Sequence, residues 1–202
     1  MLVRPPGLKI PDHINPLHLP DYYAHSVSQI DFDYLYDKCG KRFAIVDVDG
    51  TIAPYFSELD LHASSKIMSS KLRRKLLGLV LLSNCRLSFF FFFAEIRVAG
   101  FAKQLSCPYY CASIRFHKPR AESFRRAIEL LKSKYDQQLD HSQIIVIGDQ
   151  IFTDIVGGNS FEPKLHTLLV DPLKGWEPPW IRWKRKKEAP IRDFIRQNYQ
   201  EI

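Results

Sequence analysis

Short apolar runs recur along the chain from residue 43 onward, each bounded by polar or turn-forming residues. They are FAIV (43–46), GLVLL (78–82), YYCASI (109–114), IIVI (144–147) and TLLV (167–170). Because the runs are continuously apolar and do not alternate with polar positions, they predict strands that are buried on both faces.

Between the runs 109–114 and 144–147, apolar residues recur at helical spacing. The clearest case spans residues 119–135, where a proline at the first turn precedes Ala121, Phe124, Ala127, Ile128 and Leu131. Strands that alternate with helices indicate a parallel sheet covered on both faces, so we predict an α/β, doubly wound fold for residues 42–175. Residues 1–41, rich in Pro, His and Tyr, predict an irregular N-terminal arm with one short helix near 31–38, and residues 176–202 a basic, aromatic C-terminal segment.

The composition fits one globular domain. The chain has 202 residues, 46% of them hydrophobic, and a formal net charge of +7, which favours polyanionic partners: nucleic acid, an anionic membrane or a phosphorylated substrate. The four cysteines form no CxxC pair, so we interpret them as small buried hydrophobes, with metal ligation by Cys107 and Cys111 as the alternative. No apolar run approaches the ~20 residues of a membrane-spanning helix, and the first residues lack a signal-peptide core.

Three of the predicted strands end in polar side chains of matching chemistry. They are Asp47 with Asp49, Ser83 with Asn84, and Asp149 with Asp154 five residues later. A single acidic strand end is usually a turn or a helix cap, but ligands of such sheets bind beyond the carboxyl ends of the strands, where all three sets would meet. Crowded carboxylates repel one another unless a cation holds them, and hard oxygen ligands suit Mg²⁺.

The spacing of the first two carboxylates suggests that they have different catalytic roles. Asp47 and Asp49 point to the same side of an extended chain, so one can attack phosphorus while the other handles a proton. A carboxylate nucleophile would form an aspartyl-phosphate, with a metal offsetting the repulsion between the two anions. Ser83 and Asn84 would donate hydrogen bonds to the phosphoryl oxygens, and Lys118, unless it is a solvated surface lysine, would neutralise the transferring group.

The motifs DVDGT, LLSN, HKP and GDQIFTD, in this order, resemble the four motifs of the haloacid dehalogenase superfamily of phosphohydrolases. The resemblance implies that Asp47 is the nucleophile, that Asp49 is the general acid and base, and that Lys118 is the third-motif lysine. It also implies that Ser83, Asn84 and Lys118 bind phosphate. Asp47, Asp49 and Asp149 would bind Mg²⁺, with Asp154 as a supporting residue. An acid at position 49 is typical of phosphatases and phosphomutases in this superfamily, not of its dehalogenases or ion pumps.

The spacing between motifs leaves no room for a large cap domain, so we expect an open site that accepts a phosphate carried on a protein, a nucleic acid or a membrane lipid. DGTIAPYF, FAKQL, GDQIFTDIVGGN and VDPLKGWEPPWIRWKRK resemble the phosphatidylglycerophosphate phosphatases of mitochondria and plastids, an uncapped (subfamily III) branch in which Asn often replaces Gly50. This resemblance implies a phospholipid substrate on the way to cardiolipin, a peripheral position on the anionic matrix face of the mitochondrial inner membrane, and no nucleic-acid partner. The alternatives are a phosphatase for another large or soluble phosphoester and an inactive scaffold with the same fold.

Two further segments have an unusual composition. Five consecutive phenylalanines in RLSFFFFFAE (86–95) cannot be amphipathic in a helix or a strand. We interpret residues 86–94 as a retained intron, because Phe codons form a pyrimidine run; a strongly apolar core segment and a membrane-dipping loop are the alternatives. In residues 175–187, three tryptophans and five cationic residues predict either a solvated tail or a membrane-surface contact.

Overall fold

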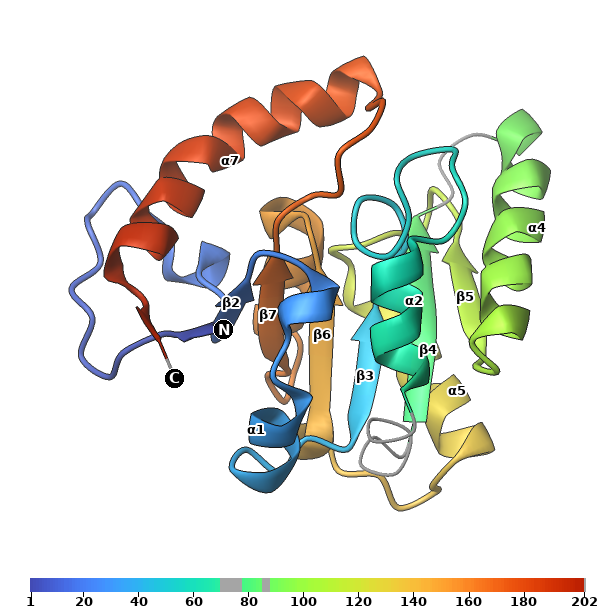
Figure 1. Cartoon of the computed structure of the whole chain (residues 1–202), viewed down its shortest axis with the longest axis horizontal. Helices are drawn as coiled ribbons and strands as arrows, with labels where there is room; N and C mark the ends of the chain where they lie inside the picture. Colours follow the sequence, from blue (N-terminus) through green and yellow to red (C-terminus); the bar gives the residue numbers. More distant parts are fainter. Residues whose placement is uncertain (70–77, 85–87, 202) are drawn as a thin grey trace.

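An eight-stranded sheet runs through the middle of the molecule in the order β5-β4-β3-β6-β7-β2-β1-β8 (Figure 1). The computed structural model describes residues 1–69, 78–84 and 88–201, without the side chains of 88–92. Its strands are β1 Leu2–Val3, β2 Tyr22–Ala24, β3 Phe43–Val46, β4 Gly78–Asn84, β5 Tyr109–Ala112, β6 Ile144–Gly148, β7 His166–Val170 and β8 Gln200–Glu201. Its α-helices are α1 Phe32–Asp37, α2 Leu61–Met68, α4 Ser88–Gln104, α5 Ala121–Lys134, α6 Val156–Asn159 and α7 Pro179–Asn198. The short 3₁₀ helices are η1 Pro16–His18, η2 Val27–Gln29 and η3 His141–Gln143, and η4 Ile151–Ile155 is a π-helix.

The six strands from β5 to β2 are parallel, and β1 then pairs antiparallel with both β2 and β8. Val46 at the end of β3 lies opposite Leu81 in β4 and Ile147 in β6. The residues that follow these positions therefore meet at one edge of the sheet. The predicted α/β fold is confirmed, and all five apolar runs form strands of this sheet.

Helices cover both faces of the sheet, which explains why its strands are continuously apolar. In β3, Ala44 and Val46 pack in one core cluster with residues of α1, α2 and α4, while Phe43 and Ile45 pack in a second cluster against α5. All four of these side chains are at most 1% exposed. Burial on both faces removes the alternation of polar and apolar residues seen in half-exposed strands.

The prediction of an irregular N-terminal arm is wrong, because residues 1–41 add two strands to the sheet. β2 runs parallel to β7, and Tyr23 at its centre is fully buried. Tyr23 packs in a third core cluster with Ile191 and Ile195 of the C-terminal helix α7. Strands of two and three residues carry too short a pattern to be identified from the sequence. They are ordered by pairing with other strands, β2 with β7 and β1 with β2 and β8. The short helix predicted near 31–38 is α1.

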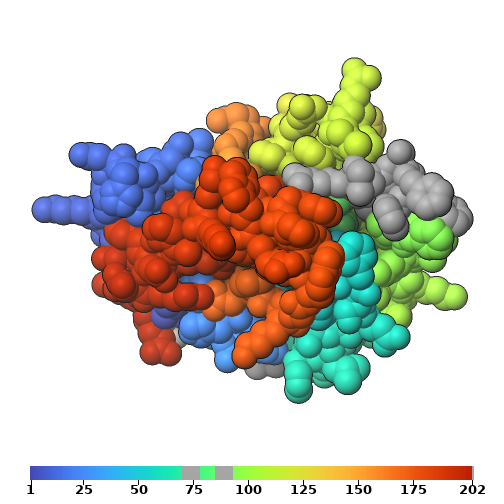
Figure 2. All heavy atoms as spheres, turned by 90° about the horizontal axis from the view of Figure 1, so that it is seen from above, coloured from blue at the N-terminus to red at the C-terminus, as the bar shows by residue number. Residues whose placement is uncertain are grey.

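In Figure 1, α7 lies above the carboxyl end of β7, and in Figure 2 the orange to red atoms of the C-terminal segment cover the middle of the face seen from above. The buried side of α7 includes Ile181, Ile191 and Ile195 but also Glu188 and Arg192, while Trp180 and Trp183 are exposed. Within the described ranges, no helix combines the length and the apolar character needed to cross a membrane.

Two sequence interpretations bear on segments that the structure describes only in part. Cys107 and Cys111 are buried, as expected for small core residues, whereas Cys85 lies outside the described residues. The backbone from Ser88 onward forms the first turns of α4, but residues 86–87 and the side chains of 88–92 lie outside the description. The origin of residues 86–94 in a retained intron therefore stays a prediction.

Candidate active site

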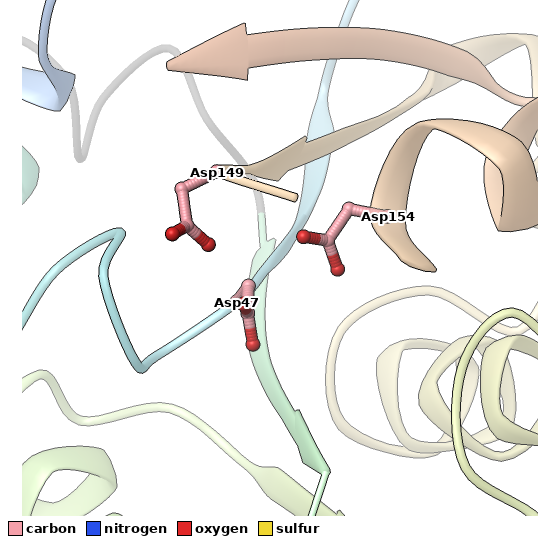
Figure 3. A group of neighbouring side chains, drawn as sticks. All are labelled: Asp47, Asp149 and Asp154. Atoms are coloured by element: carbon pink, nitrogen blue, oxygen red, sulfur yellow. The ribbon is translucent and has the colours of Figure 1, made fainter. Parts of the chain in front are cut away.

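Three buried carboxylates gather where β3 and β6 end (Figure 3). Asp47 follows β3, Asp149 follows β6, and Asp154 lies in the short π-helix η4. One oxygen of each carboxylate lies within 4.8 Å of the others, and the three residues are 6%, 0% and 1% exposed respectively. The register of the parallel strands brings Asp47 and Asp149 together, because Val46 at the end of β3 lies opposite Ile147 near the end of β6.

Lys118 supplies the positive charge inside this cluster. Its Nζ lies 2.6 Å from Asp47 Oδ1 and 2.7 Å from Asp154 Oδ1, and it donates a hydrogen bond to the carbonyl of Leu82 at 3.1 Å. The ammonium group is only 3% exposed, so the interpretation of Lys118 as a solvated surface lysine does not hold. Burial favours an uncharged lysine, but Asp154 and Asp47 outweigh it and raise the pKa of Lys118.

The carboxylates themselves carry more negative charge than Lys118 neutralises. Burial, together with the charge of Asp154, raises the pKa of Asp47 well above its usual value, against the opposing effect of Lys118. Burial also raises the pKa of Asp154. The Asp154 side chain is 1% exposed, and its Oδ1 lies 2.7 Å from the Lys118 ammonium group. Three hard oxygen donors with excess negative charge, all within 4.8 Å of one another, fit Mg²⁺, and the ligands would be Asp47, Asp149 and Asp154.

Asp49 faces a different partner. Both terminal nitrogens of Arg97 in α4 donate to Asp49 Oδ1, at 2.8 and 2.7 Å, and Ser83 Oγ lies 3.5 Å from Asp49 Oδ2. The three-carboxylate cluster includes Asp154 and not Asp49, so the expected role of Asp49 at the metal stays a prediction. Burial raises the pKa of Asp49, while Arg97 acts in the opposite direction.

The two polar residues at the end of β4 have different surroundings. Ser83 is 2% exposed and its hydroxyl points toward Asp49. Asn84 instead holds the backbone of Lys118: its Oδ1 accepts from Lys118 N at 2.8 Å and its Nδ2 donates to Lys118 O at 3.3 Å. The observed contact makes Asn84 a positioning residue for Lys118, and its direct binding of phosphate stays a prediction.

Arg185 reaches the site from α7, a contact that the sequence analysis does not anticipate. Its guanidinium group pairs with the carboxylate of Asp149, donates to the Asp149 carbonyl at 2.6 Å and contacts Glu177 and Glu188. Arg185 is only 13% exposed, so within residues 175–187 this cation belongs to the site and not to a solvated or membrane-facing surface. Glu188, which is fully buried, and Arg192 extend this charge network into the core.

The close packing around Asp149 explains why a glycine follows Asp49. Gly50 has a φ of +87°, a conformation that side chains rarely adopt, and a β-carbon there would collide with the carboxylate of Asp149. Thr51 Oγ1 donates to Asp149 Oδ1 at 3.2 Å. The chain after Asp49 thus turns tightly around Asp149, and a larger residue at position 50 would displace that carboxylate.

Comparisons with known proteins agree with this arrangement. Residues 116–172, which include Lys118, Asp149 and Asp154, match a family of hydrolases described as HAD-hydrolase-like. A probable phosphatase of Bacillus subtilis (strain 168), YqeG, is 32% identical over 97 residues, which cover 48% of this chain and 50% of that protein. The chain thus spans about half the length of the curated relative it matches. No solved structure gives a significant match. The fold, the family match and this relative support a relationship to the haloacid dehalogenase-like hydrolases.

Proposed function

We propose that the chain is a phosphoric monoester hydrolase that uses Asp47 as its nucleophile. The observation that carries this proposal is the placement of the Asp47 carboxylate at the sheet edge, held by Lys118 at 2.6 Å and flanked by Asp154 and Asp149. A carboxylate in a cation-holding pocket can attack a phosphoryl group, and a lysine beside it neutralises charge as the two anions approach.

The residues divide the reaction into two displacements. Asp47 Oδ attacks phosphorus and the ester P–O bond breaks, while Asp49 gives its proton to the leaving alcohol. Water then attacks the phosphorus of the aspartyl-phosphate as Asp49 takes a proton from it, which releases phosphate and restores the Asp47 carboxylate. Mg²⁺ bound at Asp47, Asp149 and Asp154 would supply Lewis-acid stabilisation of the phosphoryl oxygens.

Substitution of the two aspartates tests this mechanism. Asp47→Asn should abolish turnover and labelling by beryllium fluoride, because it removes the nucleophile. Asp49→Asn should lose ~10²- to 10⁴-fold in kcat but retain beryllium fluoride binding, because only proton transfer is affected. Asp193→Asn is the control, since Asp193 lies on α7 with a side chain that is 64% exposed. Near-parental activity of Asp47→Asn would contradict the mechanism.

For the substrate we propose phosphatidylglycerophosphate, which would be converted to phosphatidylglycerol. The support is the resemblance of the motif segments and of the Trp-rich stretch to that family, together with exposed aromatic residues beside the site. The cardiolipin pathway and the mitochondrial compartment rest on the same resemblance. Phosphate release by the purified chain from phosphatidylglycerophosphate, compared with release from soluble phosphoesters, separates this substrate from the alternatives, and release from none of them would favour an inactive scaffold.

A lipid substrate requires contact with a membrane, and α7 offers a suitable surface. Trp180 and Trp183 are 44% and 58% exposed, and Lys187 Nζ lies 3.8 Å from the centre of the Trp183 ring. Tryptophan favours the headgroup level of a bilayer, and lysines nearby gain energy at an anionic surface. We propose that the tryptophans and the α7 lysines (Lys184, Lys186 and Lys187) hold the protein peripherally on an anionic membrane.

A further inference from the structure

A groove of about 620 Å³ lies beside the candidate active site, between residues 54–57 and residues 174–176. Three of its seven lining residues are aromatic, and two of these, Phe56 and Trp176, are 68% and 56% exposed with their ring centres 5.5 Å apart. Among its described lining residues, Lys174 alone carries a charge. Exposed aromatic rings around a single cation are typical of a binding surface for an amphiphilic anion.

One wall of the groove is attached to the proposed general acid. Arg97, which pairs with Asp49, also donates to the carbonyl of Ser57 at 2.9 Å and to that of Pro54 at 3.2 Å. The groove-lining loop and the Asp49 carboxylate are therefore held by the same guanidinium group.

The floor and the other wall of the groove are also attached to the site. Tyr55 Oη accepts a hydrogen bond at 2.9 Å from the side chain of Gln150, the residue after Asp149. Leu173, the residue before Lys174, donates its backbone N–H to the carbonyl of Gly50 at 2.8 Å. Both walls thus begin at residues that adjoin the catalytic carboxylates.

The chemistry of the first displacement determines which part of a substrate faces this groove. The general acid delivers its proton to the oxygen of the leaving alcohol, so the alcohol must lie on the Asp49 side of the phosphoryl group. That side is where the loop 54–57 is fixed through Arg97. The alcohol part of the substrate, and not its phosphoryl group, therefore points into the groove.

We propose that the groove binds the alcohol arm of the substrate, and that this arm is a glycerol linked to an anionic phosphodiester. Lys174 would pair with the diester, while Phe56 and Trp176 would contact the glycerol and the first acyl carbons. The inference rests on the proposed function, since it assigns a second subsite to the same phosphatase. It adds the expectation that the enzyme distinguishes a phosphomonoester with a second anionic group from a simple one.

A comparison of two soluble substrates tests the groove without involving membrane binding. One is dihexanoyl phosphatidylglycerophosphate below its micelle concentration, and the other is p-nitrophenyl phosphate, whose alcohol has no diester. Lys174→Gln should lower the ratio of kcat/KM for the lipid to that for p-nitrophenyl phosphate roughly 10-fold, mainly through KM, because a charge-assisted contact is lost. Lys38→Gln is the control, because Lys38 is an exposed lysine at the end of α1. An unchanged ratio in Lys174→Gln overturns the proposal.

A binding measurement keeps this test independent of the proposed substrate. Dihexanoyl phosphatidylglycerol carries the diester but no phosphomonoester, and it should quench tryptophan fluorescence saturably in the parent, with most of the change absent in Trp176→Phe. Lys174→Gln should weaken this binding several-fold. If the parent hydrolyses p-nitrophenyl phosphate but not the lipid, the proposed substrate is wrong. The titration then tests by itself whether the groove binds an anionic phosphodiester. If the parent shows no quenching, or if neither variant changes the quenching, the proposed role of the groove is overturned.

Discussion

Replacement of Lys118 by methionine is the substitution that tests the charge balance of the site most directly. Methionine has nearly the length of lysine but no charge, so Lys118→Met keeps the packing while it leaves the carboxylates of Asp47 and Asp154 without their shared cation. The perturbation is therefore electrostatic, and it falls on groups that are at most 6% exposed.

The size of the effect follows from the contact distances. At an effective dielectric constant of about 20, an ion pair at ~2.7 Å amounts to ~6 kcal/mol, and most of this is offset by the desolvation of the charges. Removal of one partner of a buried pair typically costs ~3–5 kcal/mol, because the other charges stay buried without compensation. We expect a loss of this size in the free energy of unfolding, which is a large part of the ~5–15 kcal/mol that stabilises a typical domain.

Urea unfolding at pH 7 measures this loss, and Lys41 provides a matched control. Lys41 is 2% exposed, but its ammonium group donates to the carbonyl of Ser142 instead of a carboxylate. Lys41→Met should cost only ~1 kcal/mol, the usual value of one hydrogen bond. Addition of Mg²⁺ should stabilise Lys118→Met more than the parent, because the cation relieves the repulsion that Lys118 no longer balances. Equal losses in Lys118→Met and Lys41→Met, with no difference in the response to Mg²⁺, would refute the reasoning.

Three further predictions concern the C-terminal helix and its contacts. Replacement of the α7 lysines by Gln should weaken binding to anionic vesicles by about 1 kcal/mol per charge in a sedimentation assay, and added salt should have the same effect; unchanged binding would place membrane contact elsewhere. Arg185→Gln removes a cation from Asp149 and should tighten Mn²⁺ binding roughly tenfold, because ~1.4 kcal/mol of repulsion between Arg185 and the metal ion is relieved. Titration calorimetry measures this change, and weaker binding would mean that Arg185 orients Asp149 instead. Burial opposes ionisation of Asp171, but hydrogen bonds led by that from Tyr23 outweigh it and lower its pKa. The stability that this ionised carboxylate contributes is present above the unfolded pKa near ~3.9 and is lost as the pH falls through the folded pKa. Asp171→Asn should therefore lower the free energy of unfolding by about 2 kcal/mol at pH 7, and by progressively less below pH ~4, in urea unfolding. A difference that does not change with pH would contradict this prediction.

Local pattern was sufficient to predict most of the sheet and the acidic end of β3. The run 43–46 is apolar because both faces of β3 are covered, and this requirement is visible in four consecutive residues. Asp47 and Asp149 stand directly after apolar runs, and parallel strands place such residues at one edge, so their proximity could be predicted without a structure.

Contacts between distant segments needed the tertiary structure. Arg97 and Arg185 lie in helices whose sequence around them carries no feature that distinguishes a site residue from a surface residue, and only the docking of α4 and α7 brings them to Asp49 and Asp149. The same holds for Tyr23, whose three-residue strand is ordered by its pairing with β7.

By itself, the sequence determined the α/β class, the main strands and the carboxylates at their ends, because each depends on neighbouring residues and on the fixed direction of parallel strands. Only the tertiary structure decided that Arg97 faces Asp49, that Arg185 faces Asp149 and that a groove with Lys174 opens beside the site. These features depend on the rotation and position of helices and loops relative to the sheet, which arise from packing over the whole core and leave no local pattern in the chain.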